Sequence, residues 1–198
     1  MTNWAELYRA CNAGVIAIVE SLTSEQLAQR VPATPDWTMQ QLAAHLAGAA
    51  SDAVAGRMDG APSPEWTARH VAEREGRSAA ELAVELLETE KGAIETIAST
   101  DRPALVWDRS VHLADFYEAL GLGRPGEELW LPVYEAVGMW RLGDLPVMDV
   151  PPYELLRAVF SRRSAAQIRA WNPDLTDDQV ASIGIFGTRH DDQPVPER

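Results

Sequence analysis

The chain has 198 residues and a formal net charge of −13, a length that suits one domain or one domain with a small appendage. Its acidic balance argues against a nucleic-acid partner, because binding to phosphates requires clustered lysine and arginine. A single cysteine, Cys11, excludes an internal disulfide framework, and we expect it to be a small buried hydrophobe. The chain shows no secretory signal pattern and no apolar run close to the ~18 residues of a membrane span. We therefore expect a cytoplasmic protein with no membrane partner.

Helical periodicity dominates the first half of the chain, and strand alternation is nearly absent. Near the N-terminus, apolar residues recur at spacings of three and four and predict a first long helix. These residues are Trp4, Tyr8, Cys11, Val15, Ile18 and Leu22. A second long helix is predicted from about Thr38 to Arg57, ending at the turn around Gly60, and it contains His45.

Further helices follow in chain order. A short helix is predicted over residues 65–75 and a third long helix over residues 78–99. Pro103 opens a fourth long helix that contains Asp108 and His112 and ends near Gly121. Residues 127–142 are predicted to form another helix.

Capping boxes mark five of the predicted helix starts. In each box a serine or threonine stands three residues before a glutamine or glutamate, so that each side chain can satisfy a backbone N–H of the other. The pairs are Thr23 with Gln26, Thr38 with Gln41, Ser78 with Glu81, Ser164 with Gln167 and Thr176 with Gln179.

The predicted fold class is mainly all-α. Four long helices with inward-facing polar residues indicate a helical bundle, residues 1–143, that holds a metal at one end of its core. Residues 144–198 form a short C-terminal appendage in this prediction. It begins with an extended linker over residues 145–152, continues with short helices over 153–161 and 164–171, and ends in a frayed tail from about Thr188.

Three residues have the composition of a metal site. Asp108 and His112 stand four apart, so on a helix both side chains lie on one face. His45 lies in an apolar helical stretch, where an unpartnered imidazole is costly to bury. Two imidazoles and one carboxylate leave one tetrahedral position free, which is typical of catalytic zinc. Spacing alone leaves a second interpretation open, since Asp-x-x-x-His pairs are common on helices.

The sequence around these residues resembles the mycothiol-dependent maleylpyruvate isomerase family, in the DinB-like superfamily of metal-binding four-helix bundles. Residues 35–48, from Pro35-Asp36-Trp37-Thr38 to Ala44-His45-Leu46-Ala47-Gly48, resemble the first family pattern. Residues 109–121, with Val111-His112, Asp115 and Ala119-Leu120-Gly121, resemble the second. Segments of the C-terminal quarter, including residues 153–158, are similar to the tails of related sequences, so that the resemblance covers most of the chain.

The resemblance implies zinc or another divalent transition metal bound by His45, Asp108 and His112. Asp108 stands where the family pattern usually has glutamate. The resemblance also implies that the metal activates a low-molecular-weight thiol, mycothiol, at the open position. The predicted function is isomerisation or S-transfer on a small electrophilic substrate. The competing class is a non-catalytic bundle that binds a metal or a small ligand.

Other polar residues have two interpretations each. Asp115, one turn beyond His112, could orient that imidazole, or it could be a solvated helix charge or an interhelical hydrogen-bond acceptor. Arg157, Arg162 and Arg163, with Arg169 nearby, form a local basic island. They could bind carboxylates of a substrate or of the thiol cofactor, or they could form salt bridges with the acidic bundle.

The remaining site candidates are expected to be structural. We expect His70 and His190 to be surface residues outside the ligand set. Trp37 is interpreted as a hydrophobic anchor at the entry of the helix that contains His45, with a substrate platform as the alternative. The sequence leaves the oligomeric state open and allows a homodimer.

Overall fold

The computed structural model describes residues 2–100, 103–143, 145–187 and 189–190. The chain is mainly α-helical, which confirms the predicted fold class. It divides into two compact units, which are described separately. Unit 1 comprises Met1–Val31 and Asp36–Phe116, and unit 2 comprises Pro32–Pro35 and Tyr117–Arg198. The predicted frayed tail from Thr188 lies almost entirely outside the described residues.

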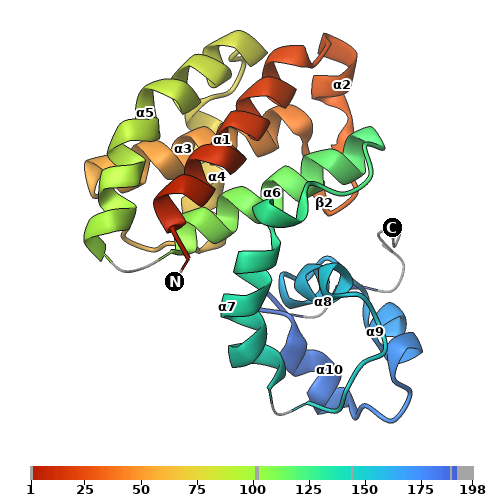
Figure 1. The fold of residues 1–198 in the computed structure, drawn as a ribbon. Coiled ribbons are helices and arrows are strands. Elements are labelled where there is room, and N and C mark those ends of the chain that lie inside the picture. The colour runs from red at the N-terminus through yellow and green to blue at the C-terminus, as the bar shows by residue number, and fades with distance from the viewer. Residues whose placement is uncertain (1, 101–102, 144, 188, 191–198) are drawn as a thin grey trace. The chain divides into compact units, whose positions relative to one another are not determined.

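Unit 1 contains the long helices of the predicted bundle (Figure 1). These are α1 (Trp4–Ser21), α3 (Met39–Ala55), α5 (Ala79–Thr100) and α6 (Ala104–Leu120), the last of which continues into unit 2. α5 packs along both α1 and α3, and the four apolar faces enclose one core. Its fully buried side chains include Tyr8, Cys11, Val15, Leu42, Leu46, Leu82, Leu86, Val106 and Leu113.

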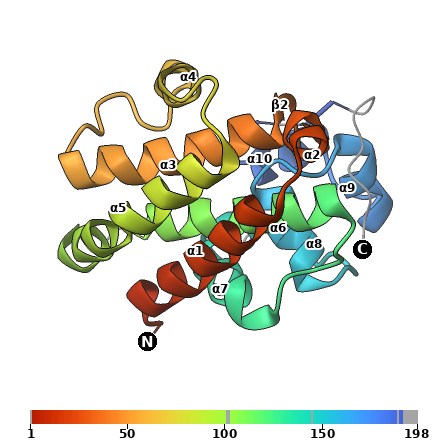
Figure 2. The ribbon, with the colours of Figure 1, turned by 90° about the horizontal axis from the view of Figure 1, so that it is seen from above.

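Two short helices complete unit 1. They are α2 (Ser24–Ala28), which contacts α3, and α4 (Pro64–Glu73), which packs across α3 (Figure 2). α4 begins with Pro64 at its first turn and with Ser63 as its N-cap, an arrangement that suits a helix start because proline has no N–H to satisfy there. α4 is important for the site described below, because it contributes a side chain to the face of α3 that contains His45.

All five predicted capping boxes are confirmed. In the box that opens α3, the Thr38 side chain accepts from the Gln41 N–H, and the Gln41 side chain accepts from the Thr38 N–H. The other four boxes have the same reciprocal pattern. Capping of this kind stabilises a helix by about 1 kcal/mol and fixes its first residue. Because the cap fixes where α3 begins, it also fixes the side of the helix on which His45 lies.

A short two-stranded sheet was missed by the sequence analysis. β1 (Arg30–Val31) pairs with β2 (Thr34–Thr38), and β2 leads directly into the cap of α3. Alternation of apolar and polar residues predicts strands only over several residues, and β2 is interrupted by Pro35. The hairpin therefore leaves little trace in the sequence pattern, although it holds Trp37 at the entry of α3.

Unit 2 consists mainly of short helices joined by loops (Figure 1). α7 packs on α8, and α10 packs on α7 and α9. The predicted boundary between bundle and appendage lies at residues 143 and 144, whereas the compact units divide after Phe116, because α7 packs within unit 2. The elements are η1 (Glu127–Leu129), α7 (Leu131–Leu142), α8 (Pro152–Val159), α9 (Ala165–Trp171) and α10 (Asp177–Ile183).

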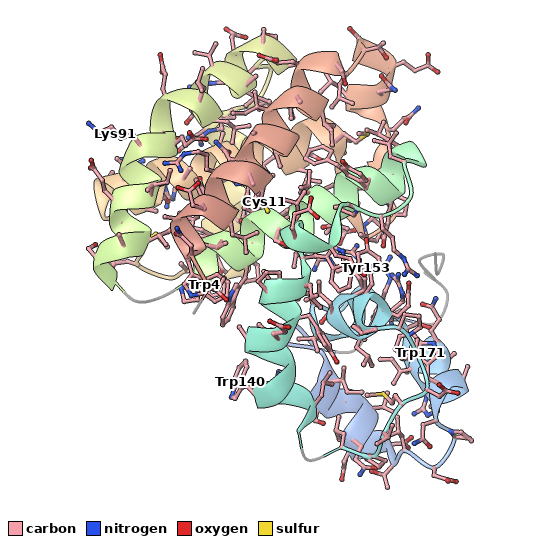
Figure 3. The ribbon with its side chains drawn as sticks, viewed as in Figure 1. Trp4, Cys11, Lys91, Trp140, Tyr153 and Trp171 are labelled. Carbon is pink, nitrogen blue, oxygen red and sulfur yellow. The ribbon has the colours of Figure 1, made fainter. Side chains whose placement is uncertain are left out.

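Figure 3 shows how differently the single cysteine and the single lysine are placed within unit 1. Cys11 lies inside the bundle and is fully buried, as expected. Lys91 lies on the outer face of α5, where its side chain is 89% exposed. Among the described residues, no helix combines the length and the apolar character that a membrane span requires.

Candidate metal centre

The three predicted ligands lie together in unit 1. His45 is in the second turn of α3, and Asp108 and His112 are on consecutive turns of α6. The Oδ1 atom of Asp108 is 3.5 Å from Nε2 of His45 and 3.4 Å from Nε2 of His112. One ligand atom from each residue lies within 4.8 Å of the other two. Two helices that are distant in sequence thus converge two imidazoles on one carboxylate.

This donor set fits a divalent transition metal. Ligands bound tetrahedrally to zinc at 2.0–2.2 Å are separated by about 3.3–3.6 Å, a range that includes both distances from Asp108 to the imidazoles. The second oxygen of Asp108, Oδ2, is buried and has no hydrogen-bond partner among the described residues. A buried carboxylate oxygen without a partner is costly, and a bound cation would compensate for this cost.

The pKa values of His45, Asp108 and His112 depend on one another. Burial lowers the pKa of His45. Burial alone would raise the pKa of Asp108, but the neighbouring His45 and His112 hold that pKa well below its ordinary value. Burial opposes the charged form of His112 as well, yet the carboxylates of Asp108 and Asp115 raise its pKa. Asp108 is therefore ionised and able to act as an anionic ligand near neutral pH.

Asp115 contacts His112 from the side opposite to the ligand atom. Its Oδ2 is 2.7 Å from Nδ1 of His112, and its side chain is fully buried. This geometry is that of a carboxylate that holds an imidazole with its other nitrogen free for a metal. It matches the orienting role, one of the three roles that the sequence left open for Asp115.

Aromatic rings surround the imidazoles. The ring of Trp37 lies 4.9 Å from that of His45 and 6.2 Å from that of His112, measured between centroids. Trp66 of α4 lies edge-on to His45 at 6.0 Å. Trp37 is half-buried, so it both anchors the entry of α3 and covers the two imidazoles. This position fits the anchor interpretation of Trp37, and the substrate-platform alternative stays a prediction.

The expectation that His70 is a surface residue was wrong. The side chain is fully buried between α4 and α3, and its Nδ1 lies 3.2 Å from Nδ1 of His45. On its other side, Nε2 of His70 lies 3.0 Å from Oδ2 of Asp52. The sequence did contain a signal for this burial, since Trp66 and His70 are four apart on α4 and face the same way. His190, in contrast, is exposed as expected.

Asp52, the residue that contacts Nε2 of His70, is itself held by two arginines. Arg57 and Arg69 both donate to its carboxylate, at 2.8 Å and 2.6 Å. Burial alone would raise the pKa of Asp52, but the hydrogen bonds from Arg69, His70 and Arg57 lower it to about 2. The carboxylate is thus fixed as a charged acceptor for His70.

The predicted arginine island lies in unit 2, where Arg157, Arg162 and Arg163 are buried and Arg169 is 41% exposed and pairs with Asp177. Arg157 donates to both oxygens of Glu118, at 2.9 Å and 2.8 Å. Arg163 donates to Glu154 at 2.6 Å and lies 3.4 Å from Glu118. Arg162 is buried as well and donates to the backbone oxygen of Phe160. This burial favours the salt-bridged interpretation, although the partners are acidic residues of unit 2, and cofactor binding by these arginines stays a prediction.

Comparison with known proteins gives one match. The family model described as mycothiol maleylpyruvate isomerase N-terminal domain matches residues 8–130. The match includes α3 and α6, and hence every predicted metal ligand. No curated protein and no solved structure matches the chain significantly.

Proposed function

Because the chain belongs to the mycothiol maleylpyruvate isomerase N-terminal domain family, we propose that it is a metal-dependent enzyme that activates a low-molecular-weight thiol. The thiol is mycothiol in this proposal, as the family description suggests. The reaction is isomerisation of, or S-transfer to, a small electrophilic substrate. The alternative is a bundle that binds a metal without catalysis.

The observation that carries the proposal is the incomplete donor set. Among the described residues, three side chains form the group able to hold a metal, one fewer than a closed structural zinc site requires. The side chain of Asp108 is 30% exposed although its Oδ2 is buried, so the cluster reaches the protein surface at Asp108. An accessible position next to the ligands is what a catalytic site needs, and it favours the enzyme over the non-catalytic alternative.

Each residue of the cluster has a defined part in this proposal. His45 and His112 offer Nε2 as neutral donors, and Asp108 offers an anionic oxygen. Asp115 accepts a hydrogen bond from Nδ1–H of His112 and so keeps Nε2 of that ring available. Trp37 lies over both imidazoles and excludes water from that side. A divalent cation held there supplies a positive charge that lowers the pKa of a neighbouring thiol.

The two reaction types share their first bond-forming step. A thiolate adds to an electrophilic carbon of a substrate double bond, so that a carbon–sulfur bond forms while the π bond breaks and its electron pair moves onto the conjugated acceptor group. In an isomerase the adduct rotates about the resulting single bond, the electron pair re-forms the double bond and the carbon–sulfur bond breaks, which returns the thiolate. In an S-transferase the adduct takes up a proton instead, and the thioether is the product. An assay with maleylpyruvate, the substrate in the family description, and a second assay for mycothiol adducts separate the two.

Metal content is the first test. We expect the purified protein to contain about one divalent metal ion per chain by elemental analysis. His45→Ala and His112→Ala should each lose most of this metal while they retain a helical circular-dichroism spectrum. Full retention of metal by both variants would contradict the assignment.

Thiol binding is the second test, and cobalt is the probe. A thiolate bound to Co²⁺ adds sulfur-to-metal charge-transfer absorption, which nitrogen and oxygen ligands do not produce. We expect mycothiol to add near-ultraviolet absorption to the cobalt-loaded protein. Cys11→Ser is the control, and the effect should persist in it because Cys11 is buried in the bundle core. If neither mycothiol nor another small thiol changes the spectrum, thiol activation is the wrong mechanism.

A further inference from the structure

A hydrogen-bonded row of side chains extends from His45 away from the metal-binding side. It runs from His45 to His70, with 3.2 Å between their Nδ1 atoms, and from Nε2 of His70 to Asp52 over 3.0 Å. His45 and Asp52 lie on one face of α3, because they are seven residues apart, close to two helical turns. His70 comes from α4 and bridges them. All three side chains are at most 3% exposed.

Gly48 makes this bridge possible. It lies on the same face of α3, three residues after His45, and a Cβ atom placed on it would be 2.4 Å from Cγ of His70. Real Cβ contacts are never this short, so a side chain at position 48 would displace the imidazole. Glycine within a helix costs about 1 kcal/mol relative to alanine. Here that cost allows the ring of His70 to lie against the bare backbone of α3.

The carboxylate of Asp52, at one end of the row, determines which nitrogen of each imidazole carries a proton. The carboxylate of Asp52 can only accept, so Nε2 of His70 carries a proton. Arg57 and Arg69 already contribute two positive charges to Asp52, and a third cation on the fully buried His70 would be unfavourable. His70 is therefore neutral, and its Nδ1 is an acceptor. Nδ1 of His45 must then be the donor, which leaves Nε2 of His45 without a proton.

We propose that Asp52 and His70 form a relay that holds His45 in the tautomer with Nδ1 protonated and Nε2 free to bind a metal. The inference rests on the proposed function for its consequence, but the tautomer itself is a property of the chain. His70 and Asp52 are positioning residues, which act through His45. They correspond to Asp115, which does the same for His112 through a single contact. One imidazole is thus oriented by a carboxylate directly, and the other through a second imidazole.

The tautomer can be measured without metal. Long-range ¹H–¹⁵N correlation spectra distinguish the protonated from the unprotonated nitrogen of each imidazole, and the chain has four histidines to assign. In the metal-free full chain at pH 7.5 we expect His45 to be protonated at Nδ1 and His70 at Nε2. A spectrum in which His45 carries its proton on Nε2 overturns the proposal.

Metal affinity supplies the second measurement, by competition for Zn²⁺ with a chromophoric chelator. His70→Leu keeps a buried side chain of similar size but removes the acceptor, and we expect zinc binding to weaken about 10- to 100-fold. His70→Asn should lose less, because its amide oxygen can accept from Nδ1 of His45. Gly48→Ala changes no polar group and improves helix propensity, but it should weaken zinc binding as His70→Leu does, since it displaces His70.

The control for general destabilisation is Asn12→Ala. Asn12 is a buried polar residue of α1 in the same unit, and it donates to the backbone oxygen of Leu86 and to Glu90 on α5. This variant should be less stable and yet bind zinc as the wild type does. Wild-type zinc affinity in both His70→Leu and Gly48→Ala overturns the proposal. A wild-type chain that binds no zinc contradicts the proposed function instead, and the spectrum of the metal-free chain still decides the tautomer.

Discussion

The two units each contain a cluster of buried polar side chains, and the two clusters differ in how they are satisfied. The metal cluster of unit 1 consists of His45, Asp108 and His112, and Oδ2 of its carboxylate has no partner among the described residues. The ion-pair cluster of unit 2 consists of Glu118, Glu154, Arg157 and Arg163. Its two carboxylates pair with its two guanidinium groups at 2.6–3.4 Å.

The comparison separates buried polar groups that support packing from those that could bind a ligand. In the ion-pair cluster the charges balance within the chain, so the cluster needs no ligand and supports the packing of unit 2. In the metal cluster Oδ2 of Asp108 is buried with no hydrogen-bond partner among the described residues, while Oδ1 lies 3.4–3.5 Å from Nε2 of the two imidazoles. Between these two clusters, the carboxylate oxygen without a partner, rather than polarity or burial, distinguishes the proposed binding site from the structural ion pairs. The following predictions test this distinction.

The largest effect should come from breaking the ion-pair cluster. Glu118→Ala leaves Arg157 buried without its bidentate partner and removes one partner of Arg163. Removal of one member of a buried ion pair costs about 3–5 kcal/mol, and we expect this decrease in the free energy of unfolding measured with urea. Glu128→Ala, at an exposed position, is the control and should change stability by less than about 0.5 kcal/mol. A loss below about 1 kcal/mol in Glu118→Ala would show that the cluster is not structural.

Zinc affinity should then depend on the charge at position 108. Asp108→Asn keeps the size but removes the anionic donor, and we expect zinc binding to weaken by at least about 100-fold, beyond the range typical of residues that support ligands. Asp108→Glu retains the charge and should bind zinc better than Asp108→Asn. Equal affinities of the two variants, measured by chelator competition, would place Asp108 outside the ligand set.

A smaller loss of affinity is expected from Asp115. Asp115→Ala removes the acceptor 2.7 Å from Nδ1 of His112, and residues in this role typically contribute 10- to 100-fold to metal affinity. Asp115→Asn is the matched variant, and it should lose less because its amide oxygen can still accept. If Asp115→Ala binds zinc like the wild type, the contact with His112 has no role in binding.

The smallest effect should appear as a pH dependence of stability at Asp52. Its pKa in the folded chain is about 2, below its ordinary value of 3.8, so ionised Asp52 stabilises the fold above pH 4. This contribution is lost as the pH falls from about 4 towards 2, and its size is about 2 kcal/mol. The difference in unfolding free energy between the wild type and Asp52→Asn should therefore shrink by about that amount between pH 5 and pH 2. A difference that does not vary with pH would mean that Asp52 titrates alike in both states.

Local signals in the sequence account for most of the fold. The capping boxes, such as Thr38 with Gln41, need only residues three apart, so they predict helix starts without knowledge of the rest of the chain. The ligand pair of α6 is predictable for the same reason, since Asp108 and His112 are one turn apart. The hairpin of β1 and β2 was missed because its pattern is too short to distinguish from a loop.

The errors concern contacts between residues that are far apart in sequence. His70 contacts His45 and Asp52 at separations of 25 and 18 residues, so the spacing of Trp66 and His70 on α4 can indicate burial of His70 but not these two partners. The role of the arginines in unit 2 is ambiguous in the sequence for a similar reason. A cluster of Arg157 and Arg163 in an acidic chain looks like a surface for anions, and only the positions of Glu118 and Glu154 show that the partners are internal.

The close approach of Gly48 to His70 has a consequence for how this family can vary. A side chain at position 48 and a ring at position 70 exclude each other, because a Cβ at position 48 would lie 2.4 Å from Cγ of the imidazole. The two positions should therefore covary among relatives, with glycine at 48 wherever a histidine stands at 70, and a larger residue at 48 only where position 70 is small. A substitution at only one of the two positions would be selected against, although neither residue belongs to the proposed ligand set.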